Sequence, residues 1–179
     1  MLKVHIKTQE LFDEANNEFV YVEDTVLKLE HSLVSISKWE EEYHIPFLDK
    51  DHAKTRNETL FYIKCMTLNN DIPDYIYNAL TNEDIARIEQ YIVDNKTATW
   101  FNERDNTGGN KEIVTSELIY YWMIANRIPP EYQWWHLSRL MTLIRICNIK
   151  NSPSEKMSEQ ETIERYRALN RARRKNGKG

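Results

Sequence analysis

The 179-residue chain is poor in glycine, proline and cysteine, with four, five and two of these residues respectively. So little glycine and proline excludes a collagen-like or low-complexity linker protein. The chain has no run of about 20 apolar residues, which argues against a membrane-spanning helix. Its N-terminus, Met1–Lys7, alternates apolar and polar residues and lacks the apolar centre of a signal peptide. We therefore expect a cytoplasmic protein with no membrane partner.

The two cysteines, Cys65 and Cys147, are far apart, and each lies inside an apolar helical pattern. Two isolated cysteines indicate neither a disulfide framework nor a zinc site with paired ligands. We expect buried free thiols that behave as small hydrophobic side chains.

The composition is otherwise that of a globular protein, with 41% hydrophobic and 29% charged residues. Its charge is divided unevenly along the chain. Residues 164–179 contain seven basic residues against the single acid Glu164, a local charge of +6. The net charge of −4 therefore leaves −10 for residues 1–163. An acidic body with a basic tail predicts an anionic partner, or association of the tail with the body.

The first part of the chain has the pattern of short strands. Leu2, Val4 and Ile6 alternate with polar residues, as in a half-buried strand. Apolar pairs on both sides of the turn-rich segment 13–17 predict a hairpin, and residues 26–31 predict one more strand. From about residue 35 the apolar period becomes helical.

Helix starts are indicated by the capping box, in which Ser or Thr is followed three residues later by Glu. This motif occurs at Ser37–Glu40, Thr55–Glu58 and Ser158–Glu161, and Thr81 begins a further helix. Two strongly apolar helices are expected on either side of Pro129–Pro130, and we expect this pair to form the centre of the fold. The expected helix ranges are 37–46, 56–68, a segment beginning at 82, 112–126 and 131–148.

Together these patterns predict an α+β, mainly α protein. A small N-terminal antiparallel sheet or hairpin occupies about residues 1–34, and a helical body occupies about residues 35–151. Residues 1–151 form a single domain in this interpretation. Residues 152–179 form a linker followed by a basic C-terminal helix or tail.

No set of residues has convincing catalytic spacing. Thr107–Asn110 lacks the pattern of a phosphate loop and is expected to be a surface turn. The group His44, His52 and Glu58 matches no metal-ligand spacing. His136 has no identifiable partner for general base catalysis and is expected in the core or an interface. The run Glu40–Glu42 is expected on a solvated helix face. The sequence thus predicts no enzyme, no catalytic residue, no metal and no cofactor.

Aromatic residues are abundant, with five tryptophans and ten tyrosines. Aromatic side chains are enriched both in cores and in interaction surfaces. The neighbours Trp134 and Trp135 lie about 100° apart on a helical wheel, so one can pack inward while the other contacts a partner. We take these two residues and Trp39 as candidate partner-binding residues, while a purely core role stays open.

The basic tail supplies a second set of candidates. Lys and Arg side chains contact phosphates without reading sequence, so nucleic acid is one candidate partner. A protein partner and a disordered, solubilising end are the alternatives, and the acidic body disfavours nucleic acid. The candidate residues are Arg165, Arg167, Arg171, Arg173, Arg174 and Lys175.

Several motifs between about residue 29 and the C-terminus resemble those of one family of small tailed-bacteriophage proteins. Members of this family are often called tail assembly chaperones. The N-terminal strands contribute little to the resemblance. The matching segments are Ser35–Glu40 with His44 and Pro46–Leu48, Thr115–Met123, Trp135–Leu137, Arg139–Leu140 through Leu143–Arg145, and Ala168–Asn170 with Ala172–Lys175.

The resemblance implies a role in the host cytoplasm during phage tail assembly. Proteins of this kind are similar in role to factors that coat the long tape measure protein before the tail tube polymerises around it. The resemblance therefore implies a non-enzymatic, homo-oligomeric protein that binds the tape measure protein. Two alternatives remain: a nucleic-acid-associated factor that uses the basic tail, and a structural component of the virion.

Overall fold

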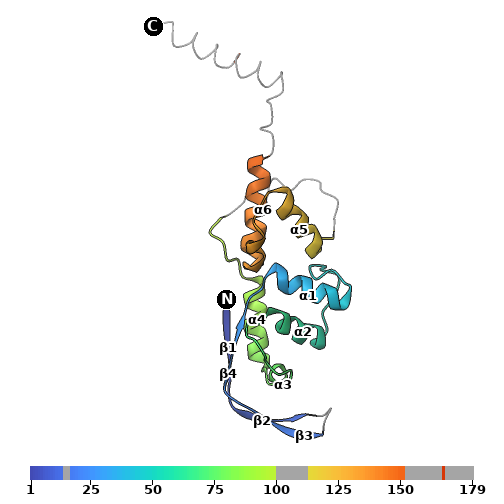
Figure 1. Ribbon diagram of the computed structural model, residues 1–179, viewed down its shortest axis with the longest axis vertical. Helices are drawn as coiled ribbons and strands as arrows, with labels where there is room; N and C mark the ends of the chain where they lie inside the picture. Colours follow the sequence, from blue (N-terminus) through green and yellow to red (C-terminus); the bar gives the residue numbers. More distant parts are fainter. Residues whose placement is uncertain (14–16, 100–112, 152–166, 168–179) are drawn as a thin grey trace. The chain divides into compact units, whose positions relative to one another are not determined.

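The computed structural model describes residues 1–13, 17–99, 113–151 and 167 (Figure 1). The chain divides into two compact units, Met1–Cys147 and Asn148–Gly179. The expected α+β, mainly helical architecture is confirmed, because all described strands precede the helices. The elements are β1 (Leu2–Ile6), β2 (Gln9–Asp13), β3 (Glu18–Val22), β4 (Thr25–Leu29), α1 (Leu33–Tyr43), α2 (Arg56–Met66), α3 (Tyr75–Asn78), α4 (Asn82–Val93), α5 (Ser116–Ala125), the 3₁₀ helix η2 (Pro130–Trp134) and α6 (Leu137–Asn151).

The strands form a long antiparallel ribbon. β1 pairs with β4, and β2 pairs with β3 in the expected hairpin. Ile6 lies opposite Thr25 and Gln9 lies opposite Val22, three residues further along each strand, so the register continues across the break. In Figure 1 the β2–β3 half continues from the end of the β1–β4 half.

The face of the ribbon that packs on the helical body differs between its two halves, β1–β4 and β2–β3. In β1 the even-numbered residues Val4 and Ile6 are buried, whereas in β2 the even-numbered Phe12 is exposed and Leu11 is half-buried. Side chains alternate between the two faces of a strand, so an unbroken strand would have placed Phe12 on the same side as Val4. The break at residues 7–8 therefore reverses which face of the ribbon is packed.

The core of the first unit lies where the β1–β4 sheet meets the helices that follow it. α2 contacts β4, α4 contacts β1, and α1 packs against both α2 and α5. Most of the largest fully buried side chains come from the ribbon, α1 and α2: Val4, Val22, Leu27, Leu29, Leu33, Ile36, Trp39, Ile63 and Met66.

The expectation that α5 and α6 form the centre was therefore wrong. Among the largest fully buried side chains, α5 supplies Ile119 and α6 supplies Leu140. α5 is apolar on several sides, and its residues Tyr121 and Ile124 are exposed. The apolar composition of α5 therefore led to an overestimate of how deeply this helix is buried.

The start of α1 differs from the sequence-based prediction. Its N-cap is Ser32, whose hydroxyl accepts the Ser35 backbone N–H at 3.3 Å, while the Ser35 hydroxyl accepts the Ser32 N–H at 2.8 Å. Ser37 lies inside the helix. The cap expected at Thr55 is confirmed, and α4 begins at Thr81 as expected; each threonine makes a reciprocal bond with the residue three positions on.

The helix expected from Glu131 was wrong in its first part. Residues 130–134 form the 3₁₀ helix η2, and α6 begins only at Leu137. Between them, His136 forms an isolated bridge with Ser32, and the Leu137 N–H donates to the His31 carbonyl at 2.8 Å. This pairing with the segment before α1 takes the backbone out of the helical path. None of the helices in the described part of the chain combines the length and apolarity needed to span a bilayer.

Candidate partner-binding surface

The 3₁₀ helix η2 carries an aromatic surface. Trp134 at its end is 51% exposed. The rings of Tyr132 and Trp135 stack with their centroids 4.2 Å apart and their planes at 18°. The Arg139 guanidinium lies over the Trp135 ring, 4.5 Å from its centroid. We call Tyr132, Trp134, Trp135 and Arg139 the η2 surface.

Two hydrogen bonds hold the backbone and side chains of the segment that carries the η2 surface. The Tyr120 hydroxyl on α5 donates to the Gln133 side-chain oxygen at 3.0 Å, and the Trp135 N–H donates to the Tyr132 carbonyl at 3.0 Å. Tryptophan, tyrosine and arginine are the residues enriched in binding hot spots. The two neighbouring tryptophans differ in exposure: Trp134 is exposed and Trp135 is only partly so, although neither lies on the α-helix from which a difference was expected.

Trp39 does not belong to an exposed surface, which corrects its assignment as a partner-binding residue. Its side chain is fully buried, and its indole N–H donates to the Glu58 carbonyl at 3.1 Å. The rings of Tyr43 and Phe47 lie 4.9 and 5.2 Å from its own, centroid to centroid. The period-3.6 pattern of α1 directs this residue into the core, so a partner cannot reach it.

The basic residues predicted to bind a partner fall almost entirely outside the described part of the chain. This holds for Arg165, Arg171, Arg173, Arg174 and Lys175. Arg167 is described and is exposed. All six remain predicted binding residues. The expected linker and basic tail at residues 152–179 also remain a prediction, because nearly all of this segment lies outside the described residues.

A second aromatic surface was not identified from the sequence. On the β2–β3 hairpin, Phe12, Phe19 and Tyr21 are all at least half-exposed. The available signal was the shift in alternation between Ile6 and Leu11, which places the apolar side chains of the two ribbon halves on opposite faces.

Glu40 was expected on a solvated helix face, and this expectation was wrong. The side chain is buried, with one carboxylate oxygen accepting the Phe47 N–H and the other accepting the Ser116 N–H, both at 2.8 Å. Two backbone donors replace the water that the charge loses on burial. Glu40 therefore links α1 to the start of α5, while its neighbours Glu41 and Glu42 are exposed as expected.

Two buried histidines meet where the ribbon, α1 and α6 converge. The rings of His31 and His136 are 5.2 Å apart, centroid to centroid, and both side chains are at most 5% exposed. Burial, with a smaller contribution from His136, lowers the pKa of His31 to about 3. Burial also lowers the pKa of His136. Both imidazoles are therefore neutral near pH 7.

The hydrogen bonds of the pair agree with neutral rings. His31 Nδ1 lies 2.5 Å from the Tyr62 hydroxyl, and burial raises the pKa of Tyr62, so the hydroxyl keeps its proton and shares a hydrogen bond with the neutral ring. His136 Nε2 donates to the Tyr91 carbonyl at 3.1 Å, and its Nδ1 lies 2.9 Å from the Ser138 hydroxyl. The ring nitrogens of His136 and Nδ1 of His31 are thus used in structural bonds, as expected of a core histidine at position 136.

The loose cluster of His44, His52 and Glu58 is drawn together only in part. His52 Nε2 lies 3.1 Å from a Glu58 oxygen, and the Thr55 backbone and hydroxyl lower the pKa of that carboxyl. His44 caps the end of α1 and is exposed. Within the described ranges, no group of three or more His, Cys, Asp or Glu side chains is arranged to hold a metal ion.

Both cysteines are free thiols, as expected, although they are half-buried and not fully buried. Burial raises the pKa of the Cys65 thiol to about 11. Because the thiolate is the nucleophilic form, this thiol is poorly suited to nucleophilic chemistry near pH 7.

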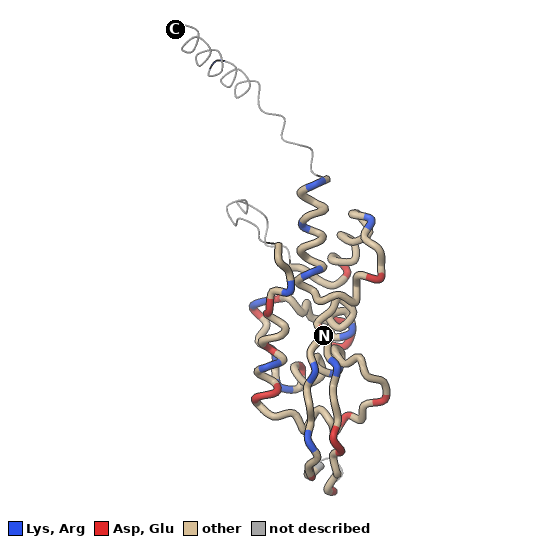
Figure 2. Tube along the Cα trace, turned by 90° about the vertical axis from the view of Figure 1, so that its left-hand side faces the viewer, with Lys and Arg blue, Asp and Glu red and all other residues tan. Residues whose placement is uncertain are grey.

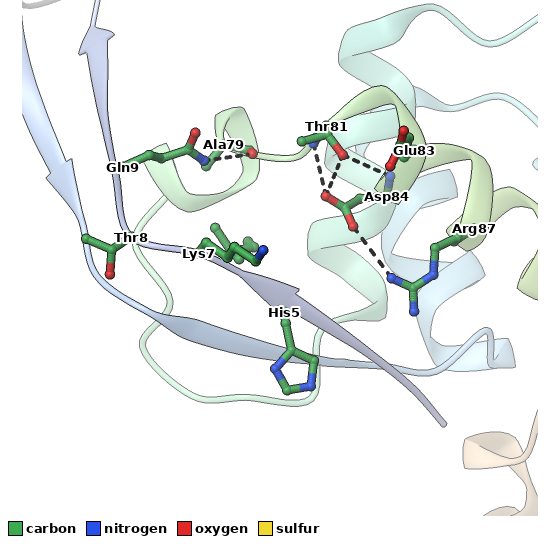
Figure 3. A pocket seen from close by; sticks show the side chains of 10 residues that line it. His5, Lys7, Thr8, Gln9, Ala79, Thr81, Glu83, Asp84 and Arg87 are labelled. Carbon is green, nitrogen blue, oxygen red and sulfur yellow. Dashed lines mark hydrogen bonds and ion pairs between the residues drawn. The ribbon is translucent and has the colours of Figure 1, made fainter.

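One surface pocket lies between the break in the ribbon and the start of α4 (Figure 3). Its volume is about 470 Å³, and its polar lining mixes both signs of charge. Asp84 accepts bonds from the Thr81 N–H and hydroxyl at 3.2 and 2.7 Å, and lies 3.8 Å from Arg87. These groups largely satisfy one another, and none of the residues predicted to bind a partner lines the pocket.

Comparison of the chain with family models, with curated proteins and with solved structures gives no match.

Proposed function

We propose that the chain is a non-enzymatic tail assembly protein of a tailed bacteriophage, which binds the tape measure protein in the host cytoplasm. The observation that carries this proposal is the η2 surface, where Trp134 is half-exposed beside the stacked rings of Tyr132 and Trp135. The motifs that resemble the tail assembly chaperones supply the biological context. Binding and masking an apolar client requires an adhesive surface and no chemistry.

The η2 surface suits an apolar helical client for energetic reasons. An exposed indole offers a large apolar area with few rotatable bonds, so little conformational entropy is lost on binding. The flanking bonds, Tyr120 to Gln133 and Leu137 to His31, hold the turn before the client arrives. Arg139 adds a cation over the Trp135 ring.

Co-expression with the tape measure protein of the same phage tests this proposal. The wild-type chain should co-purify with the tape measure protein and keep it out of the insoluble fraction. Trp134→Ser should weaken that binding at least about tenfold, as expected for a hot-spot residue. Ile124→Ser is the matched control, since Ile124 is 76% exposed on α5 and lies outside the η2 surface. Binding that is unchanged in Trp134→Ser would contradict the role of this surface.

A nucleic-acid-associated role is the second candidate, and the seven basic residues between Arg165 and Lys178 favour it. Binding of the full chain to double-stranded DNA would then fall steeply with salt, with a logarithmic slope of about −0.9 for each phosphate contacted. Arg173→Glu with Arg174→Glu should flatten that slope by about two contacts. Affinity that does not respond to salt would exclude this role.

A structural role in the virion is the third candidate, and it predicts a different location for the protein. A structural component stays in purified phage particles, whereas an assembly factor leaves before the particle is complete. Mass spectrometry of purified particles separates the two, because a stoichiometric amount of the chain supports the structural role and its absence supports the assembly role.

A further inference from the structure

The β2–β3 hairpin presents an aromatic face to solvent. Phe12, Phe19 and Tyr21 are 50%, 74% and 59% exposed, and the rings of Phe12 and Phe19 meet edge to face at 5.2 Å. The register sets Phe12 opposite Phe19 and Glu10 opposite Tyr21. Directly opposed side chains point to the same side of a sheet, so these four share one face. We call it the hairpin face.

The opposite side of the hairpin is the one packed on the helical body. There Val22 is fully buried, Leu11 is half-buried, and the Gln9 side-chain amide donates to the Ala79 carbonyl at 3.1 Å. The hairpin is therefore attached through one side while the hairpin face remains open. Neighbouring exposed aromatic side chains of this size are a mark of an interaction site.

The hairpin is also strongly acidic. Residues 9–24 contain six acidic residues and no lysine or arginine. Of these acids, Glu10, Glu18, Glu23 and Asp24 are described and exposed, and acidic positions are coloured red in Figure 2. A segment that covers the hairpin face must therefore combine apolar side chains with positive charge.

One segment of the same chain has this composition. Residues 164–179 carry a net charge of +6, opposite in sign and equal in size to the charge of residues 9–24. They also include Tyr166 and Leu169, which have the three-residue spacing of side chains on one helix face. We propose that the hairpin face of one copy binds residues 164–179 of a second copy.

The proposed contact is heterologous, because two different surfaces meet. Each copy that binds through its hairpin face keeps its own C-terminal segment for the next copy, so the contact builds a ring or a filament. Such an assembly would present successive η2 surfaces along an extended client. The inference goes beyond the proposed function, because it concerns how copies of the chain bind one another and does not depend on the identity of the client.

Size-exclusion chromatography with light scattering, on the full chain over a range of concentrations, measures the contact. The wild-type chain should form oligomers that weaken at high salt. Glu10→Lys with Glu23→Lys should weaken association about tenfold or more, and so should Arg173→Glu with Arg174→Glu. Mixing these two variants with each other should restore association, because each one then supplies the charge that the other has lost.

Phe19→Ser tests the aromatic part of the contact, and Ile124→Ser serves as the equally exposed control. We expect Phe19→Ser alone to weaken association, with both variants unfolding at the wild-type temperature. A monomeric wild-type chain, hairpin variants that associate normally, or a mixture of charge variants that stays monomeric would each overturn the inference. Tape measure binding is measured on the same variants: if it persists while the variants associate normally, the inference fails and the proposed client binding does not.

Discussion

At the scale of single residues, the Glu40 carboxylate joins the end of α1 to the start of α5. Glu40→Gln keeps the shape of the side chain but leaves only one oxygen for the two N–H groups of Phe47 and Ser116. We expect the free energy of unfolding to fall by about 1.5–3 kcal/mol, the usual contribution of hydrogen bonds to a charged group. Urea unfolding measures this loss. Glu41→Gln, at an exposed neighbouring position, should change stability by less than about 0.5 kcal/mol; equal losses in the two variants would contradict the assigned role.

The role of Glu40 could not be predicted from the sequence. It lies in a run of three glutamates, and the other two are solvated as such runs usually are. Its two hydrogen-bond donors lie 7 and 76 positions further along the chain. A local charge pattern contains no information about a donor so distant, and only the packing of α5 on α1 brings it into reach.

His31 makes the stability of the first unit depend on pH. Its pKa is lowered by burial, and to a smaller extent by His136, from 6.5 to about 3. Below about pH 6.5 the unfolded chain binds a proton at this residue that the folded chain does not bind. The free energy of unfolding should therefore fall by about 1.4 kcal/mol per pH unit as the pH drops from about 6 towards 3. The lowered pKa of His136 acts in the same direction.

Urea unfolding at a series of pH values tests the contribution of His31. His31→Gln removes the titrating group and should make the dependence on pH shallower between pH 6 and 4. His5→Gln, at an exposed position of β1, is the control substitution. A slope that is the same in His31→Gln and in the wild-type chain would show that other groups account for it.

At the scale of elements, the sequence predicted two helix starts correctly. The capping box of Thr55 with Glu58 marked the start of α2, and Thr81, which is followed by acids in the first turn, marked the start of α4. Ser32 was missed, because its partner is Ser35, and serine is not the glutamate or glutamine that the motif specifies. Ser37 satisfied the motif but lies within α1, because the apolar face that begins at Leu33 extends the helix by a turn before it.

The Thr55 cap gives a test of how much one such motif stabilises its helix. The Thr55 hydroxyl accepts the Glu58 N–H at 3.3 Å, and the Glu58 carboxylate accepts the Thr55 N–H at 2.6 Å. Thr55→Ala should lower the free energy of unfolding by about 1 kcal/mol, the usual cost of losing a threonine cap. Thr59→Ala, inside the same helix, removes a hydroxyl without removing a cap and should cost less, because alanine is the better helix former. Chemical denaturation of both variants measures the two losses. A larger loss in Thr55→Ala shows that the cap stabilises the helix, whereas equal losses would show that replacing any threonine of this segment has the same effect.

At the scale of the whole molecule, local patterns predicted the order of strands and helices but not where they pack. The apolarity of α5 and α6 suggested a centre there, whereas the β1–β4 sheet, α1 and α2 supply most of the fully buried side chains. Two backbone hydrogen bonds also join β4 and the residue after it to the end of α2. The Leu68 N–H donates to the Lys28 carbonyl, and the Glu30 N–H donates to the Met66 carbonyl. These contacts depend on the three-dimensional path of the chain, which periodicity along the sequence does not contain.

Substitution of two tryptophans, one in the core and one on the surface, tests where the core of the molecule lies. Trp39 is fully buried, and Trp39→Ala removes its ring and leaves the Glu58 carbonyl without its indole donor. We expect a loss of about 3–5 kcal/mol, a large part of the 5–15 kcal/mol that stabilises a typical domain. Thermal unfolding followed by circular dichroism should therefore show a much lower transition temperature in Trp39→Ala. Trp134→Ala, at the half-exposed end of η2, should unfold close to the wild-type temperature.

The contrast between these variants extends to partner binding. Loss of client binding in Trp134→Ala with an intact fold is the result that the η2 surface requires, because only a surface residue can be removed from an interface without disturbing the core. Loss of client binding in Trp39→Ala would follow from unfolding alone. If Trp39→Ala unfolded at the wild-type temperature, the position of the core around α1 and α2 would be wrong. If Trp134→Ala collapsed instead, Trp134 would be a structural residue, and the case for binding at η2 would lose its central side chain.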